Sequence, residues 1–164
     1  MTGNQNFNEK PDYLYRSGVG AMVINAQKKI FVGKRIDNNS NAWQMPQGGI
    51  ESGEPEDVAV FRELFEETGI QENSLKIIKK SSGYFYYNLP YNLQKRFWGG
   101  KYLGQKQRWY LLSFNAEDCM ININLESPEF CEWKWVDKAE ILDLIVNFKK
   151  HLYRDILNEF DKFL

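Results

Sequence analysis

The pattern of apolar and polar positions predicts β-strands through much of the chain. Two apolar runs, residues 18–25 (GVGAMVIN) and 29–35 (KIFVGKR), are separated by three residues, which favours a β-hairpin. The polar residues 37–41 (DNNSN) that follow are predicted to form a loop. Further apolar runs predict strands over residues 75–81, 83–89, 108–115 and 133–136.

Residues 56–68 give the clearest helical pattern. Pro55 suits the first turn of a helix, the acidic residues beside it favour the N-terminus, and Gly69 suits the C-cap. The spacing predicts a helix that buries the apolar side chains of Val58, Ala59, Phe61, Leu64 and Phe65.

The C-terminal part of the chain predicts two more helices. Asp137 is a plausible N-cap for a short one, and residues 147–163 carry apolar side chains every three or four positions. Strands interleaved with helices indicate an α/β fold in which a mixed sheet lies between helices. We expect a flexible polar tail over residues 1–13 and a single domain over 14–164.

Composition narrows the class of protein. The 164 residues are 43% apolar and 26% charged, as in an ordinary globular domain, and no run of apolar residues is long enough to span a membrane. The first twenty residues lack the pattern of a signal peptide, so a cytoplasmic protein is expected. A net charge of −1 excludes a protein that holds nucleic acid mainly through bulk charge.

The two cysteines and the single histidine do not indicate a function. Cys119 and Cys131 form neither a disulfide framework nor a zinc motif, and we expect buried or half-buried thiols. His151 lies in the predicted C-terminal helix without a nucleophile motif around it, which favours a packing or surface role.

Three carboxylates on the helix at 56–68 carry the chemical signal. Glu63, Glu66 and Glu67 stand at i, i+3 and i+4 and therefore share one helix face. Carboxylates this close repel one another, unless hard divalent cations that prefer oxygen ligands lie among them. Because Mg²⁺ also bridges to phosphates, this face indicates metal-assisted chemistry on a phosphorylated substrate. A merely solvated acidic face is the alternative.

The wider spacing around these glutamates resembles the Nudix box. The pattern is Gly48, five residues, Glu54, seven residues, Arg62-Glu63-Leu64, one residue, Glu66-Glu67, one residue, and Gly69-Ile70. The resemblance implies an α/β/α sandwich, with Mg²⁺, or Mn²⁺ or another divalent cation in its place, bound by the box glutamates Glu63, Glu66 and Glu67 and by a main-chain carbonyl at or next to Gly48. It also implies structural roles for Glu54 and Gly69, and for Arg62 the task of holding the catalytic loop on the helix.

Segments outside the box are similar to the bacterial RNA pyrophosphohydrolases and the related dinucleoside polyphosphate hydrolases of this family. They are residues 16–20 (RSGVG), 43–49 (WQMPQGG), 104–109 (GQKQRW), 127–130 (SPEF), 133–136 (WKWV) and 148–150 (FKK). This resemblance makes Glu129 an additional metal ligand or the base on the attacking water, with Glu66 as the other candidate base. It makes Arg16, Arg35 and Lys149 phosphate contacts, Phe148 a stacking platform for a base and Tyr87 a further RNA contact.

Packing offers an alternative reading for several of these side chains. Phe148 has the helical spacing of a core residue, at least two of the four aromatic residues 84–87 are expected in the core, and Trp43 more simply packs on the sheet. Lys95 and Arg96 are expected in solvent. The surrounding segment, residues 91–102, is either a lid over the substrate or an irregular surface loop.

The resemblance implies an enzyme that converts 5′-triphosphate RNA to 5′-monophosphate RNA, releasing pyrophosphate and promoting mRNA decay. Hydrolysis of dinucleoside polyphosphates such as Ap4A or Ap5A is the main alternative. A non-catalytic binder of nucleotides or RNA ends and a phosphatase of free nucleoside triphosphates are further ones. The expected partner is an RNA 5′ end or a nucleotide, and nothing in the sequence indicates a membrane or an obligate protein partner.

Overall fold

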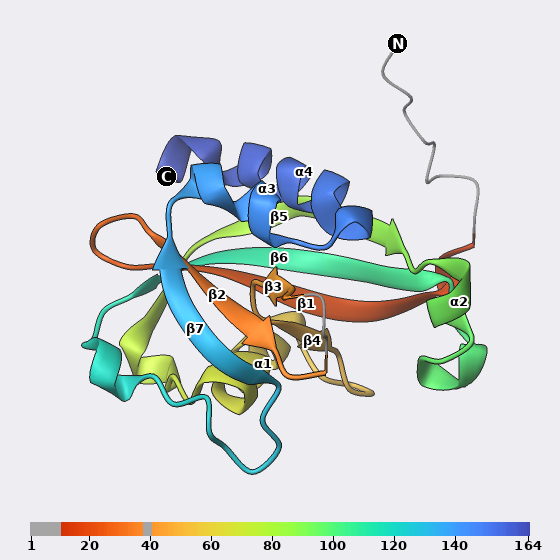
Figure 1. The fold of residues 1–164 in the computed structure, drawn as a ribbon, viewed down its shortest axis with the longest axis horizontal. Helices are drawn as coiled ribbons and strands as arrows, with labels where there is room; N and C mark the ends of the chain where they lie inside the picture. The colour runs from red at the N-terminus through yellow and green to blue at the C-terminus, as the bar shows by residue number, and fades with distance from the viewer. Residues whose placement is uncertain (1–10, 38–40) are drawn as a thin grey trace.

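The computed structural model describes residues 11–37 and 41–164 and shows an α/β/α sandwich (Figure 1). Residues 1–10 of the predicted tail and residues 38–40 of the predicted loop lie outside the described part. Asp12 and Tyr13, the last residues of the predicted tail, belong to the 3-10 turn Asp12–Leu14, in which an Asp12 carboxylate oxygen lies 2.6 Å from Lys106 Nζ. None of the helices in the described part is both long and apolar enough to cross a membrane.

A mixed sheet forms the centre of the described structure. Its main path runs β3 (Trp43–Gln44), β2 (Ile30–Arg35), β1 (Tyr15–Ile24), β6 (Gly104–Phe114) and β5 (Leu75–Asn88). The short β4 (Gln47–Gly49) pairs with β1, and β7 (Phe130–Val136) pairs with β2. The neighbours β1 and β6 are parallel along their whole length, whereas β5 is antiparallel to β6.

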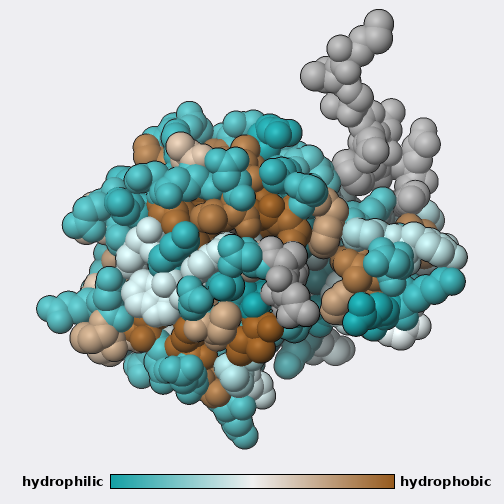
Figure 2. All heavy atoms as spheres, viewed as in Figure 1, coloured by the Kyte–Doolittle hydropathy of each residue, from teal (hydrophilic) through white to brown (hydrophobic). Residues whose placement is uncertain are grey.

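Helices cover the two faces of this sheet. On one face lies α1 (Glu56–Thr68), and on the other lie α3 (Ile141–Leu144) and α4 (Lys150–Phe160) (Figure 1). Each face has its own hydrophobic core. The core under α4 includes Leu152, Ile156 and Phe160, and the core at α1 includes Ala59, Val60 and Leu64. Figure 2 shows apolar side chains gathered in the band between the α3–α4 layer and the sheet.

The predicted start and end of α1 are confirmed, and of the predicted apolar face Ala59, Phe61 and Leu64 are confirmed, whereas Val58 and Phe65 are wrong. The helix follows Pro55 and ends at Gly69, whose φ of 68° is left-handed and whose N–H donates to the Phe65 carbonyl oxygen. Val58 and Phe65 are 54% and 48% exposed. The buried side chains are those of Ala59, Val60, Leu64, Glu67 and Thr68. The helix is thus rotated so that small residues face the sheet and Glu67 lies beneath β4.

Other predicted boundaries also change. Residues 75–81 and 83–89 are one long strand, β5, because irregular pairing with β6 between Ile77 and Tyr84 bends the strand without ending it. The strand predicted at 133–136 already begins at Phe130. The predicted C-terminal helix is divided into the turn Asn147–Lys149, α4 and the turn Asp161–Phe163.

Both cysteines are exposed, contrary to the expectation of buried or half-buried thiols. Cys119 lies in the short turn Asp118–Met120, outside the sheet. Cys131 lies on β7, where its neighbour Phe130 takes the buried position and strand alternation sends Cys131 to the other side.

A glycine permits the close packing of β1 on the buried indole of Trp109. Gly20 pairs with Trp109 across the two parallel strands, and a Cβ at Gly20 would lie 2.3 Å from the ring. We therefore expect Gly20→Ala to lower the free energy of unfolding by about 1–3 kcal/mol, measured by urea denaturation. Gly83→Ala is the control, because a Cβ there meets no atom within 4 Å and should change stability by less than about 0.5 kcal/mol. Equal effects of the two changes would contradict this packing.

Candidate active site

The guanidinium of Arg62 joins the loop after β4 to helix α1. Its Nε and Nη2 donate to the two carboxylate oxygens of Glu54 at 2.7 and 2.8 Å, and Nη2 also donates to the Gly49 carbonyl oxygen at 2.8 Å. Nη1 donates to Glu63 at 2.8 Å and to Glu66 at 3.2 Å. Bonding to Arg62 lowers the pKa of Glu54 to about 2, so Glu54 is ionised at neutral pH. One side chain thus sets the spacing between the loop and the helix.

Glu63 lies directly against the backbone of Gly48. A Cβ on Gly48 would fall 1.9 Å from the Glu63 carboxyl carbon, so only glycine leaves room for this carboxylate. Burial raises the pKa of Glu63 to about 7, and the nearby charges of Glu66 and Glu129 act in the same direction, although Arg62 opposes them.

Glu67 is the most buried carboxylate of the group, with 2% of its surface exposed. One carboxylate oxygen accepts a hydrogen bond from the Gln47 N–H at 3.3 Å, while Oε1 is buried without a partner among the described residues. Burial raises the pKa of Glu67 well above its usual value, and the charge of Glu129, a hydrogen bond with the Glu129 carboxyl group and the charge of Glu63 act in the same direction. The structure therefore gathers three glutamates from α1 and Glu129 from the residue just before β7.

This donor set fits a hard divalent cation. Carboxylate oxygens are the ligands that Mg²⁺ and Mn²⁺ favour, and a cation would supply the missing partner of Glu67 Oε1. In the described part, no three of the acidic side chains are already arranged as ligands around one point. Arg62 bonds one carboxylate oxygen of Glu63 and one of Glu66. The other oxygen of each carboxylate is not bonded to Arg62 and could ligate a cation.

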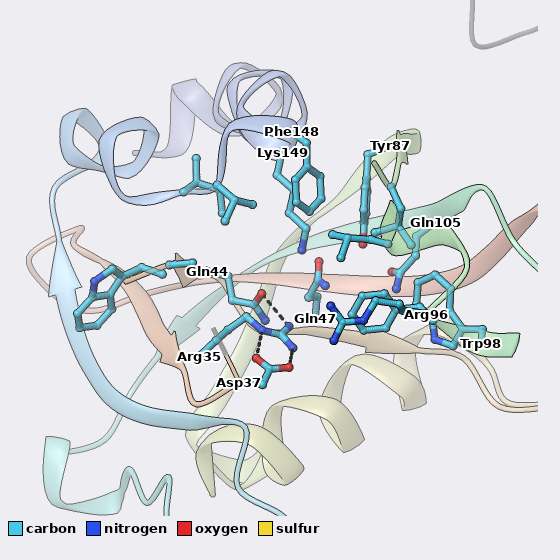
Figure 3. A pocket seen from close by; sticks show the side chains of 17 residues that line it. Arg35, Asp37, Gln44, Gln47, Tyr87, Arg96, Trp98, Gln105, Phe148 and Lys149 are labelled. Carbon is cyan, nitrogen blue, oxygen red and sulfur yellow. Dashed lines mark hydrogen bonds and ion pairs between the residues drawn. The ribbon is translucent and has the colours of Figure 1, made fainter. Parts of the chain in front are cut away.

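A pocket of about 480 Å³ lies beside the carboxylates. Gln47 connects the two, because its side chain lines the pocket while its backbone N–H bonds Glu67. The other polar and aromatic side chains that line it include Arg35, Asp37, Gln44, Tyr87, Arg96, Trp98, Gln105, Phe148 and Lys149 (Figure 3).

The cations of this pocket come from different elements. Arg35, at the end of β2, donates to both carboxylate oxygens of Asp37 at 2.7 and 2.5 Å and to the Gln44 side chain at 3.3 Å. Lys149 precedes α4 and is 6% exposed, with Nζ lying 5.1 Å from the centre of the Tyr87 ring. Burial lowers the pKa of Lys149 to about 7, and the positive charge of Arg35 contributes. A bound phosphate would restore the lysine charge.

Two aromatic rings form part of the pocket wall. Phe148 is half-buried, and its ring centre lies 6.3 Å from that of Tyr87 at an angle of 37°. Tyr87 itself is only 2% exposed. Phe148 was predicted either to pack in the core or to serve as a stacking platform for a base. It packs against the core and also lines the pocket. Trp43 is 7% exposed and belongs to the core, as its packing alternative predicts.

Arg16 and the segment 91–102 extend the site. Arg16 is half-buried on β1, and its guanidinium carbon lies 5.1 Å from the centre of the Trp98 ring. Residues 91–102 form the short helix α2 (Tyr91–Gln94) and the turn Trp98–Gly100. Arg96 and Trp98 from this segment line the pocket, although neither was predicted as a site residue. The mixture of basic and aromatic residues in the segment was the feature that indicated a role near the substrate.

The sandwich with a carboxylate cluster on the loop and helix after β4 defines the Nudix class of hydrolases. A sequence model of the NUDIX domain matches residues 14–156, and the chain belongs to this family. Nudix hydrolases generally use divalent cations. Curated relatives are named RNA pyrophosphohydrolase. The one from Pelagibacter ubique is 49% identical, covering 86% of this chain and 88% of the relative, and the one from Roseobacter denitrificans is 44% identical, covering 92% and 94%.

Solved structures share the fold at lower identity. The Escherichia coli dihydroneopterin triphosphate pyrophosphohydrolase superposes with a TM-score of 0.69 at 20% identity, over 87% of this chain and 96% of that one. A binary complex of the Caenorhabditis elegans Ap4A hydrolase gives 0.61 at 17% identity, over 88% and 98%. At these identities the likeness establishes the sandwich architecture alone.

The buried Lys149 should destabilise the fold. Its pKa of about 7 in the folded state lies below the value of 10.5 in the unfolded chain. The buried lysine therefore lowers the free energy of unfolding most at and below pH 7, and this destabilisation disappears as pH rises to about 10.5. We expect Lys149→Met to raise the free energy of unfolding at pH 7 by on the order of 1–3 kcal/mol. The gain should shrink at pH 9.5, as urea denaturation at the two pH values would measure.

The control is Lys150→Met, at the neighbouring and only half-buried position, which should shift stability by less than about 0.5 kcal/mol. A loss of stability in Lys149→Met at pH 7 would contradict the assignment of Lys149 as a buried, electrostatically unfavourable group.

Proposed function

We propose that this chain is an RNA pyrophosphohydrolase that converts 5′-triphosphate RNA to 5′-monophosphate RNA with release of pyrophosphate. The observation that carries the proposal is one arrangement: a carboxylate cluster around the buried Glu67 lies directly beside a pocket with cationic and aromatic walls. The carboxylates would act on a phosphoric anhydride, and the pocket would hold the nucleoside linked to it. Relatives that are 44–49% identical over most of the chain carry this activity in their names.

Within this proposal, the carboxylates hold one or more Mg²⁺ ions. The ligands would be Glu63, Glu66, Glu67 and Glu129, together with the main-chain carbonyl of Gly48. Bound cations would polarise phosphoryl oxygens and neutralise charge as the anhydride breaks. The fit rests on the buried and unpartnered Glu67 Oε1, which a cation would satisfy.

A water molecule must also lose a proton to attack phosphorus, and Glu129 and Glu66 are the candidate bases. Glu129 is the stronger one for two reasons. It is exposed just before β7 and so reaches solvent water, and its negative charge raises the pKa of both Glu63 and Glu67. Glu66, in contrast, has one carboxylate oxygen engaged by Arg62, which leaves only the other oxygen to accept a proton from water.

The neighbouring pocket would hold the 5′ end. Lys149 and Arg35 would contact phosphate oxygens, and the ring of Phe148 would stack on a base, backed by Tyr87. Stacking on an aromatic side chain contributes roughly 1–3 kcal/mol per base and tolerates any base. This suits a substrate that is defined by its end rather than by its sequence.

Hydrolysis of dinucleoside polyphosphates is the second candidate. These molecules also present a nucleoside joined to a chain of phosphates, so the same pocket and the same carboxylates would serve. A non-catalytic binder is less well supported, because the four box glutamates and Arg62 are all present, and Arg62 bonds Glu54, Glu63 and Glu66.

The proposal predicts that Glu67→Gln abolishes most activity. With Mg²⁺, the wild-type protein should convert 5′-triphosphate RNA to the monophosphate, and Glu67→Gln should lower the rate at least about 100-fold, since a neutral amide is a poor cation ligand. Release of pyrophosphate and the RNA end group would be measured together. Glu72→Gln, at an exposed glutamate beyond α1, is the matched control and should keep the wild-type rate. Equal activity of wild type and Glu67→Gln would overturn the assigned centre.

A further inference from the structure

The guanidinium of Arg16 is enclosed between a glycine and an indole ring. On one side a Cβ at Gly49 would lie 2.1 Å from Arg16 Nη2, so the guanidinium occupies the space that any side chain at Gly49 would need. On the other side the Trp98 ring lies 5.1 Å from the guanidinium carbon, within range of a cation–π interaction. The Arg16 guanidinium thus lies between β4 and the turn Trp98–Gly100.

The enclosed guanidinium is also close to the contact between Gly49 and Arg62. The carbonyl oxygen of Gly49, the residue against which Arg16 packs, accepts the hydrogen bond from Arg62. In the described part of the chain Arg16 forms no ion pair, so its charge is not neutralised by a protein carboxylate. The charge of Arg16 also acts on the hydroxyl of Tyr87 in the pocket wall. The guanidinium therefore lies between the carboxylate cluster and the pocket.

The backbone at Trp98 is held in an unfavourable conformation. Its φ is 49°, in the left-handed region that bulky side chains rarely adopt, and Gly99 and Gly100 follow with φ values of 66° and 74°. Such strain persists only where surrounding contacts over-determine it. Here the conformation directs the indole over Arg16 and into the pocket wall, and Tyr102 supports it with an edge-on ring 6.1 Å away.

We propose that Trp98 is a positioning residue, which holds the Arg16 guanidinium against Gly49 so that it binds the phosphate chain of the substrate. This inference rests on the proposed function in its choice of substrate, a 5′-polyphosphate, but the contact between Trp98 and Arg16 is independent of it. The segment 91–102 then contributes to phosphate binding through Arg16, rather than as a lid.

The test is a double-mutant cycle between Trp98 and Arg16. Trp98→Leu removes the π-system but keeps a side chain with the same left-handed strain. For 5′-triphosphate RNA it should raise KM about 5- to 20-fold and change kcat less than about twofold. Trp98→Phe, which keeps an aromatic face, should recover part of this loss. In an Arg16→Gln background, Trp98→Leu should have no further effect. Additive effects of the two changes would overturn the proposal and indicate that Trp98 contacts the substrate itself.

Tyr91→Leu is the matched control. Tyr91 lies in the same segment, stacks on the Lys95 ammonium at 4.8 Å and is 72% exposed, but it does not line the pocket. Tyr91→Leu should leave KM and kcat unchanged, and a KM effect equal to that of Trp98→Leu would contradict the specific role of Trp98.

A second measurement does not depend on activity. The ring current of Trp98 should shift the NMR resonances of the Arg16 side chain upfield, and Trp98→Leu should remove this shift while Tyr91→Leu preserves it. An unchanged Arg16 spectrum in Trp98→Leu would overturn the proposed contact. If wild-type protein failed to hydrolyse 5′-triphosphate RNA while the Arg16 shift was present, the proposed function would fail and the positioning contact would stand.

Discussion

The Arg62 guanidinium bonds both the loop and the helix α1 of the candidate active site, and these bonds determine where the glutamates of the site lie. It binds Glu54 and the Gly49 carbonyl on the loop side and Glu63 and Glu66 on the helix side. An arginine suits this task, because its planar group offers five donors in a fixed geometry, which a lysine lacks. With the loop fixed in this way, Gly48 lies on Glu63, and Gln47 lies over Glu67.

The charges around this network are individually unfavourable. Burial raises the pKa values of Glu63 and Glu67, and burial lowers the pKa of Lys149 on the other side of the pocket. The opposite charges of Glu67 and Lys149 compensate each other only in part, since burial remains the largest influence on both. A polyphosphate with its divalent cations would meet both needs, giving cations to the carboxylates and negative oxygens to the lysine. The folded state is thus less stable than it would be without these buried charged side chains, which are held in place for a ligand.

The sequence predicted the parts of this structure in which local spacing determines geometry. Pro55, the acidic residues beside it and Gly69 led to the correct start and end of the helix. The buried face of α1 was predicted only in part, because hydrophobicity alone selects Val58 and Phe65, whereas the structure buries Val60 and Glu67 beside the predicted Ala59 and Leu64.

Contacts between distant parts of the chain were beyond sequence reasoning. Lys149 and Tyr87 are 62 positions apart, yet they meet in the pocket, where the resemblance to relatives rather than the pattern suggested them. The role of Trp98 in the pocket wall depends on an unusual backbone angle, which no propensity indicates. The exposed cysteines likewise follow from strand register and from a turn, not from the residue type.

The most direct test of the account compares substrates under one condition. The ratio kcat/KM would be measured for a 5′-triphosphate RNA and for Ap5A at the same Mg²⁺ concentration, with Glu67→Gln as the background control. The account predicts that the RNA is the better substrate and that both reactions depend on Glu67. A higher kcat/KM for Ap5A would contradict the assignment of an RNA 5′ end as the substrate.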